Sequence, residues 1–116
     1  MKPEIWGPHA WIFLHSVTFD YPDNPSPRIK EQFKNFFESL QYILPCEMCR
    51  EHYKNNLKRF PITNNVLKSR KSLIEWLIDI HNNVNKSNKK PKLKYQEVVK
   101  KYFDYYEGKD LKEPPK

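Results

Sequence analysis

The sequence predicts an all-α fold, a four-helix bundle plus a short fifth helix. Apolar residues recur three and four positions apart along several segments, which is the spacing of one helix face. Prolines and polar stretches separate these segments, and no stretch of the chain forms a convincing strand pattern. At 116 residues, the chain is expected to fold as one domain with a modest core.

The first two helices flank a proline-containing loop. The first is expected over residues 8–19, where most side chains are apolar. The loop at residues 21–25 contains two prolines, which a helix interior does not accept. Ser26 and Pro27 then supply an N-cap and a first-turn proline for a second helix that Pro45 ends. Its apolar face consists of Ile29, Phe33, Phe36, Phe37, Leu40 and Leu44.

Three further helices are expected after Pro45. They cover about residues 46–58, 71–85 and 95–107, and Gly108 stands where a C-terminal cap belongs. The face of the fourth helix carries Leu73, Leu77, Ile80, His81 and Val84, and that of the fifth carries Tyr95, Val98, Val99, Tyr102 and Tyr106. Residues 1–108 should therefore form the domain, and residues 109–116 a flexible tail.

The formal net charge of +7 admits three interpretations. A nucleic-acid surface is one, a lysine-rich solvated surface is another, and a site for a dinucleotide pyrophosphate is the third. No nucleic-acid recognition motif accompanies the lysines, so the solvated surface is favoured. Much of the excess lies in Lys86, Lys89, Lys90, Lys92, Lys94, Lys100 and Lys101.

Cysteine use and hydropathy exclude several classes of protein. The two cysteines lie close together, whereas a secreted disulfide scaffold would carry more of them in spread pairs. No apolar run approaches the roughly 18 residues of a membrane span, and residues 1–4 show no apolar segment of a secretory signal.

The pair Cys46 and Cys49 is the first candidate site. At this spacing, two cysteines at a helix start can close a disulfide, and the helix N-terminus favours a thiolate and so a reactive pair. Two other interpretations remain open. One is half of a zinc site completed by His52 and another histidine, and the other is two inert buried cysteines.

Two further segments place polar and aromatic side chains on apolar helix faces. His81 and Asn85 share a face with Leu77, so their polar groups need either a bound ligand or a capped helix end. Trp11 and His15 are spaced to lie on one face, where a stacked pair could hold a flat ring system or simply belong to the core.

Glycine is too scarce for a phosphate-binding loop. The chain has two glycines, Gly7 and Gly108, which excludes the glycine-rich site of a Rossmann fold. Any dinucleotide bound here must be held by side chains.

Taken in order, these segments resemble the Erv/ALR family of FAD-dependent sulfhydryl oxidases, and especially its short members encoded by large DNA viruses. The family order is Gly-x-x-x-Trp-x-x-Leu-His, a Tyr-Pro loop, Pro-Cys-x-x-Cys, and His-Asn-x-Val-Asn followed by Lys-Pro. The corresponding segments here begin at Gly7, Tyr21, Pro45, His81 and Lys90. The resemblance spans about residues 7–102.

The resemblance implies FAD held non-covalently within the bundle. Cys49 would be the sulfur beside the flavin, and Cys46 the outer sulfur that meets the substrate thiol. The residues that it implies for FAD binding are Gly7, Trp11, His15, Tyr21, Cys49, His52, His81, Asn82, Val84, Asn85, Lys90 and Tyr102. No metal site is implied.

The implied activity is disulfide formation in protein thiols, with electrons passing through Cys46 and Cys49 to FAD and then to molecular oxygen, which gives hydrogen peroxide. Expected partners are protein thiols, such as a thioredoxin-like carrier, and a second copy of the chain, with no nucleic acid and no membrane. The expected location is cytoplasmic, in the host cell or virion of a virus, with the mitochondrial intermembrane space as the alternative. A zinc-binding interaction module and a basic nucleic-acid-binding domain remain as alternative functions.

The chain departs from the family pattern at two points. It lacks the shuttle disulfide and the structural cysteine pair that many relatives carry. Where the family usually has Leu-Gly before Lys-Pro, this chain has Asn88 and Lys89, so the conformation of that loop is open.

Overall fold

The computed structural model describes residues 1–107, and it is helical throughout its regular structure. Its elements are α1 (Pro3–Phe19), α2 (Pro27–Ile43), α3 (Glu47–Arg59), α4 (Asn64–Leu67), α5 (Arg70–Ser87) and α6 (Tyr95–Tyr106). The predicted all-α fold is confirmed, and the five predicted helices are all present. The short helix α4 was not predicted. The expected cap at Gly108 and the expected tail at 109–116 lie outside the described residues.

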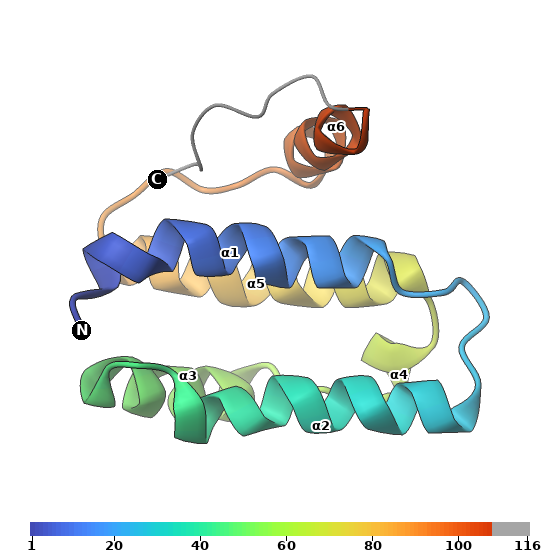
Figure 1. The fold of residues 1–116 in the computed structure, drawn as a ribbon, viewed down its shortest axis with the longest axis horizontal. Helices are drawn as coiled ribbons and strands as arrows, with labels where there is room; N and C mark the ends of the chain where they lie inside the picture. The colour runs from blue at the N-terminus through green and yellow to red at the C-terminus, as the bar shows by residue number, and fades with distance from the viewer. Residues whose placement is uncertain (108–116) are drawn as a thin grey trace.

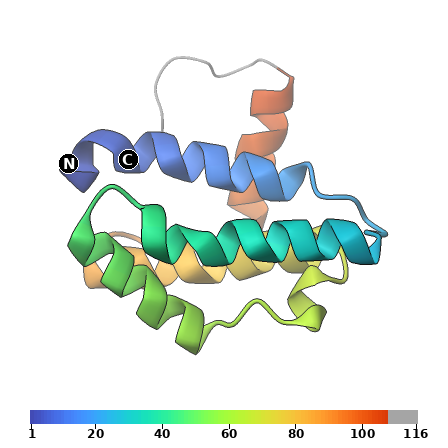
Figure 2. The same ribbon diagram turned by 60° about the horizontal axis from the view of Figure 1, so that its bottom comes forward.

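The helices form two layers with α6 outside them. Helix α1 lies beside α5 in one layer, and α2 lies beside α3 in the other (Figure 1). Helix α6 packs over the α1–α5 layer on the side away from α2 and α3, and it crosses α1 at a steep angle (Figure 2). The layers are thus joined through α1 and α5, which face α2 and α3 on one side and α6 on the other.

Two apolar clusters fill the spaces on the two sides of α5. Leu73, Leu77 and Ile80 point into the larger cluster, between the layers, whereas Ile74 and Ile78 pack against α6. Burial of each such aliphatic side chain stabilises the fold by about 1.5–3 kcal/mol. Because α5 buries apolar side chains on two faces, it is the central helix of the protein.

Side-chain caps set several helix starts. The Ser26 hydroxyl accepts the Ile29 amide at 3.2 Å, as expected for the start of α2. Thr63 caps α4 in the same way through the Val66 amide, and Ser69 and Ser72 form a reciprocal capping box at the start of α5.

Helix α1 begins earlier than predicted. The sequence predicts a helix start at Pro8, but α1 already begins at Pro3 and contains Pro8 in its interior. A proline there removes only the bond to the carbonyl of Glu4. Glu4 is exposed, so water can bond that carbonyl instead. A proline near an exposed helix start therefore did not end the helix.

The end of α5 is closed by a left-handed residue that is not glycine. Lys89 has φ 57° and follows the C-cap Asn88. The Lys90 amide donates to the carbonyl of Asn85 at 2.8 Å, and the Lys89 amide donates to that of Lys86 at 3.2 Å. These two bonds are those of the Schellman motif, in which the left-handed position is usually glycine. The chain after α5 thus makes a turn that usually requires glycine, although lysine occupies the left-handed position.

Candidate functional site

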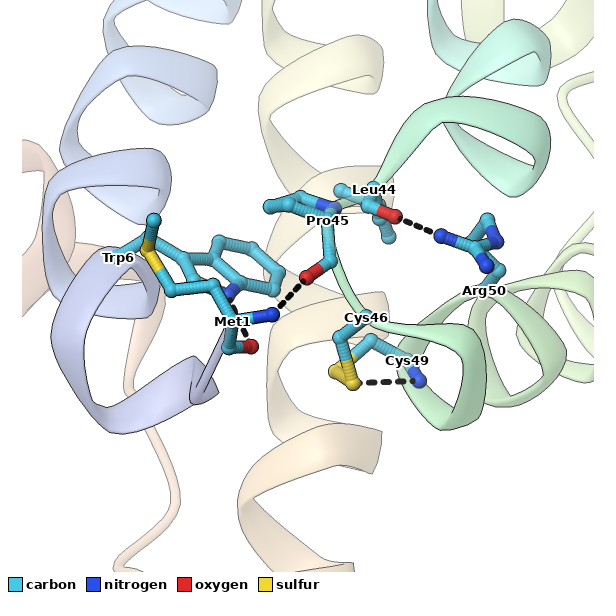
Figure 3. The surroundings of a disulfide bond; sticks show 7 residues. All are labelled: Met1, Trp6, Leu44, Pro45, Cys46, Cys49 and Arg50. Atoms are coloured by element: carbon cyan, nitrogen blue, oxygen red, sulfur yellow. Dashed lines mark hydrogen bonds between the residues drawn. A yellow bond between two sulfur atoms is a disulfide. The ribbon is translucent and has the colours of Figure 1, made fainter.

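Cys46 and Cys49 form a disulfide at the start of α3 (Figure 3). Cys46 is the N-cap residue, and its Sγ accepts a hydrogen bond from the Cys49 amide at 3.2 Å. Both cysteines are half-buried, and the Glu47 and Met48 side chains between them are exposed. The amide and the positive end of the helix dipole favour negative charge on sulfur here, so the pair is placed for thiol–disulfide exchange.

Bonds to backbone carbonyls hold the segment that leads into the disulfide. The Arg50 guanidinium donates to the carbonyl of Leu44 at 2.6 Å, and the Met1 nitrogen donates to that of Pro45 at 2.9 Å (Figure 3). The Trp6 indole N–H in turn donates to the Met1 carbonyl at 3.2 Å. Residues from the start of α1 and from α3 therefore fix the backbone before Cys46 from two sides.

Four rings from α1, α5 and α6 meet on the other layer. We call Trp11, His15, His81 and Tyr102 the ring cluster. Trp11 stacks on His81 with ring centroids 3.7 Å apart and planes 2° from parallel. Trp11 is tilted by 33° to His15, so its stacked partner is His81, and not His15 as in one of the two possibilities that the sequence left open. The centroid of the Tyr102 ring lies 5.3 Å from that of the His15 ring, which completes the cluster.

The two histidines of the ring cluster share one hydrogen bond. His15 Nε2 lies 2.8 Å from His81 Nδ1, so one ring donates and the other accepts. Burial is the main cause that lowers the pKa of His15 to about 4 and that of His81 to about 3. Repulsion from Lys101 adds to both shifts, and His15 and Lys90 add to that of His81. Both rings are therefore neutral at pH 7.

One polar atom of the ring cluster has no partner. His15 Nδ1 is buried and makes no hydrogen bond within the described residues. Whichever histidine donates the shared hydrogen bond, this nitrogen is left as an unpaired donor or acceptor. Buried polar atoms of this kind cost roughly 1–3 kcal/mol unless a ligand or water pairs with them.

The asparagines after His81 hold the loop between α5 and α6. The Asn82 side chain accepts the Leu93 amide at 2.7 Å and donates to the Leu93 carbonyl at 3.0 Å. The Asn85 side chain donates to the Pro91 carbonyl at 3.3 Å. Within the described residues, these two amides therefore bond to the backbone of the loop that follows α5.

Basic side chains surround a pocket beside this loop. The pocket has a volume of about 390 Å³ and is lined by Phe60, Asp79, Asn82, Asn83, Lys86, Lys90 and Lys92. A second pocket of about 420 Å³ shares Asp79, Asn82 and Lys92 and continues towards Tyr95. Neither of these pockets is lined by Cys49 or by Trp11. The lysines give the first pocket a positive surface that suits a phosphate group.

The remaining predicted site residues are dispersed. Val84 is half-buried, His52 is exposed on α3, and Lys90 is exposed in the loop after α5. Gly7 lies on α1, where an added Cβ would meet nothing within 4 Å. Tyr21 is fully buried, and its hydroxyl donates to the Leu67 carbonyl at 2.7 Å. The structure thus groups Trp11, His15, His81 and Tyr102, and the ring contacts that join them do not include Gly7, Tyr21 or His52.

Sequence reasoning missed two groups of residues near these sites. Asn56 on α3 and Asn83 on α5 are joined by a hydrogen bond between their side-chain amides. Arg50 beside the disulfide was missed as well. The helical spacing of Asn83 from Trp76 and of Asn56 from Cys49 would have placed these asparagines on inward faces, but the contact between them depends on tertiary packing.

Comparison with known proteins gives consistent matches over most of the chain. The model of the Erv1/Alr family matches residues 8–104. A probable FAD-linked sulfhydryl oxidase of Acanthamoeba polyphaga mimivirus is 44% identical over 99 residues, which cover 85% of this chain and 69% of that protein. The mitochondrial FAD-linked sulfhydryl oxidase ERV1 of Saccharomyces cerevisiae is 33% identical over 77% of this chain and 46% of its own length.

Solved structures of the yeast protein share the fold. The yeast Erv1 core superimposes with a TM-score of 0.82 at 30% identity, covering 90% of this chain and 86% of that chain. The FAD-binding domain of Erv1 from Saccharomyces cerevisiae gives a TM-score of 0.82 at 31% identity, covering 90% and 96% of the two chains. In sequence and in fold, the chain belongs to the Erv1/Alr family.

Proposed function

We propose that this protein is an FAD-linked sulfhydryl oxidase that forms disulfide bonds in protein thiols. The observation that carries the proposal is a half-exposed Cys46–Cys49 disulfide at a helix N-terminus, within a chain that belongs to the Erv1/Alr family. The relatives from mimivirus and yeast are named for this activity, which agrees with the activity predicted from the sequence. The same names support FAD as the cofactor.

The residues present fit a flavin nucleotide. The parallel rings of Trp11 and His81 offer a flat aromatic surface, and His15 Nδ1 is a buried polar atom that needs a partner. The pocket lined by Lys86, Lys90 and Lys92 supplies cations for a pyrophosphate. Trp11, His15, His81 and Tyr102 would hold the ring systems, and Lys90 would bind phosphate. For Gly7, Tyr21, His52, Asn82, Val84 and Asn85, contact with FAD stays a prediction.

The chemistry of this chain begins with thiol–disulfide exchange. A substrate thiolate attacks Cys46 Sγ, which forms a mixed disulfide and breaks the Cys46–Cys49 bond, so that Cys49 leaves as a thiolate. A second substrate thiolate attacks the substrate sulfur of that mixed disulfide, which releases the oxidised substrate and leaves Cys46 reduced. FAD, held by the ring cluster and Lys90, would supply the redox chemistry by which the two electrons of the reduced pair reach molecular oxygen and give hydrogen peroxide.

The surroundings of the pair assist these steps. The Cys49 amide donates to Cys46 Sγ and stabilises negative charge on that sulfur while the bond to the substrate forms and breaks. The bonds from Arg50 and Met1 fix the backbone on either side of Pro45, so the attacked sulfur keeps its orientation. The protein therefore supplies position and electrostatics, and the cofactor supplies the redox chemistry.

The two alternative functions are not supported. A zinc-binding module would need a group of three or more His, Cys, Asp or Glu ligands, and residues 1–107 contain no such group. Cys46, Cys49 and His52 therefore do not make one. A basic nucleic-acid-binding domain has no support among the relatives, which are named as oxidases.

A visible absorption spectrum of the purified protein tests the proposed activity. We expect a yellow protein with a flavin absorbance band, which consumes oxygen when a dithiol is added. Protein that is colourless, and that takes up no FAD on reconstitution, would contradict the proposal.

Substrate proteins would reach Cys46 directly, because this cysteine is partly exposed at the start of α3. A thioredoxin-like carrier or another dithiol protein is the partner that we propose. In Cys49→Ser, the mixed disulfide at Cys46 cannot be resolved from within the protein, so it should accumulate. Non-reducing gels and mass spectrometry should place the adduct on Cys46. Absence of an adduct, in cells where the wild type is active, would show that substrates enter elsewhere.

We also propose a homodimer formed through the outer faces of α1 and α2. Exposed apolar side chains on these faces are Ile5 and Phe13 on α1 and Ile43 on α2. Phe13 meets Phe36 of α2 edge-on, with ring centroids 6.4 Å apart. Exposed apolar groups across two neighbouring helices are typical of a protein interface. Sedimentation should show a dimer that Phe13→Glu dissociates, and a wild-type protein that is monomeric at all concentrations would refute it.

The proposed location follows the viral relatives. No helix among the described residues has the length and apolarity needed to cross a membrane. One relative comes from a virus and another is named mitochondrial. We propose the host cytoplasm or virion, with the mitochondrial intermembrane space as the alternative.

Residues 1–108 are proposed as the catalytic domain and residues 109–116 as a tail.

A further inference from the structure

Asn83 points away from the ring cluster and towards the helix that carries the disulfide. Its Nδ2 donates to the side-chain oxygen of Asn56 on α3, and its Oδ1 accepts the Arg59 guanidinium at 3.4 Å. Asn56 is buried, and Asn83 is half-buried. Leaving a buried amide without a partner costs about 1–3 kcal/mol, so this bond resists any movement that separates the two helices.

Asn56 lies on the face of α3 that carries Cys49, and Asn83 lies on the face of α5 that carries Trp76. On α3, Cys49, Tyr53 and Asn56 follow the i, i+4, i+7 spacing of one face. On α5, Trp76 and Asn83 have the same i, i+7 relation, and the Trp76 indole donates to the Phe60 carbonyl at the end of α3 at 2.7 Å. One face of α5 is therefore bonded at two levels to the C-terminal half of α3.

This connection joins the two layers of the fold. Helix α3 carries Cys49 at its start, and α5 carries His81 close to Asn83. Both helices are continuous between these positions, so a shift at the amide pair moves Cys49 relative to the ring cluster. Reacting groups must be held close to their reactive geometry, and a displacement of about 1 Å can slow a reaction by roughly 100-fold.

We propose that Asn56 and Asn83 are a positioning pair that holds Cys49 in contact with the flavin. The proposal rests on the proposed function, since the flavin is the group that Cys49 must meet. Neither asparagine touches the reacting atoms. They act through α3 and α5, with Arg59 orienting the Asn83 amide.

The test uses FAD-loaded protein that carries Cys46→Ser, so that Cys49 has no disulfide partner. A thiolate in contact with an oxidised flavin gives a long-wavelength charge-transfer absorbance, whose intensity per bound FAD reports that contact. We expect Asn83→Ala and Asn56→Ala each to weaken this band. With both cysteines present, the same variants should show roughly tenfold slower flavin reduction by a dithiol under anaerobic conditions.

Two controls separate positioning from a general loss of structure. Asn56→Asp should keep the band, because the Asn83 amide can still donate to a carboxylate oxygen at that position. Asn55→Ala removes an exposed amide next to Asn56 and should have no effect. If an alanine variant does not fold by circular dichroism, the corresponding serine variant replaces it, since a hydroxyl fills more space but is too short to bridge the helices.

The outcomes distinguish this proposal from the proposed function. A Cys46→Ser protein that binds no FAD contradicts the function itself. If it binds FAD without the band, Cys49 is not beside the flavin, and the positioning pair is refuted. Undiminished absorbance in both alanine variants, or equal loss in Asn56→Asp or Asn55→Ala, refutes the positioning pair while leaving the oxidase intact.

Discussion

The disulfide and the ring cluster lie on different layers and are held by different interactions. Cys46 and Cys49 are half-exposed, and backbone carbonyls and a helix N-terminus determine their surroundings. The ring cluster is enclosed by α1, α5 and α6, with neutral histidines and stacked rings. A group that exchanges with another protein must be reachable, whereas a group that holds a cofactor must be dry and preformed. Substitutions should therefore affect chemistry alone at the first site, and binding together with stability at the second.

The largest expected effect is loss of turnover at the disulfide. Cys49→Ala should abolish dithiol oxidation while FAD remains bound, because in the proposed path the cysteines carry the electrons and other side chains hold the cofactor. Oxygen consumption and flavin absorbance measure the two properties separately. Met48→Ala, which changes the exposed residue between the cysteines, should keep its turnover. Full activity in Cys49→Ala would exclude the proposed path.

At the ring cluster, the same comparison predicts the opposite pattern. Trp11→Ala should lower FAD occupancy and should also destabilise the protein by about 3 kcal/mol, since it removes a stacked ring and leaves a cavity. His81→Ala should act in the same direction. Trp6→Ala provides the matched control, because Trp6 is on the same helix but bonds to Met1 near the disulfide. Normal FAD content in both ring-cluster variants would place the cofactor elsewhere.

The free energy of unfolding should also depend on pH through the two histidines of the ring cluster. The pKa values of His15 and His81 are lowered to about 4 and about 3, whereas histidine in an unfolded chain titrates near 6.5. As pH falls below about 6.5, the two histidines bind protons in the unfolded chain but stay neutral in the folded protein, so the free energy of unfolding decreases. Each histidine can contribute up to about 1.4 kcal/mol per pH unit in that window.

Urea unfolding between about pH 7 and pH 5 measures this slope. The slope should be smaller in His15→Asn than in the wild-type protein. A stability that does not change over this range would mean that the two buried rings are not held neutral.

The smallest effect is expected beside the disulfide. Arg50→Ala removes the bond to the Leu44 carbonyl and should cost about 1 kcal/mol, because water can partly replace the guanidinium at this half-exposed position. Lys54→Ala, an exposed cation farther along α3, serves as the control. Equal unfolding midpoints for the two variants would show that this bond contributes nothing to the stability of the disulfide segment.

Local signals predicted most of the fold. The start of α2 follows from Ser26 and Pro27, and the disulfide follows from the spacing of Cys46 and Cys49 in the sequence. Helix α4 was missed because a single turn has no periodicity to detect. The early start of α1 was missed because Pro8 is tolerated where Glu4 is exposed.

Contacts between distant residues could not be predicted in the same way. Trp11 stacks on His81, although His15 is its neighbour along the helix. Helical spacing placed Trp11 and His15 on one face, but the packing of α1 against α5 decides which ring lies parallel to which. The asparagine amides show the same limit, since their partners at Pro91 and Leu93 come from a loop whose path no local pattern specifies.

Lys89 has a consequence for how distant members of this family are recognised. The two hydrogen bonds at the end of α5 hold Lys89 in a left-handed conformation. This conformation costs a residue other than glycine about 1–2 kcal/mol. Lysine thus forms here a left-handed turn whose position glycine usually occupies. A search pattern that requires glycine at this position would reject this chain, whereas one that scores hydrogen-bonded turns would accept it. Divergent relatives should therefore be sought by the conformation of the turn, with asparagine, lysine and glycine treated as equivalent there.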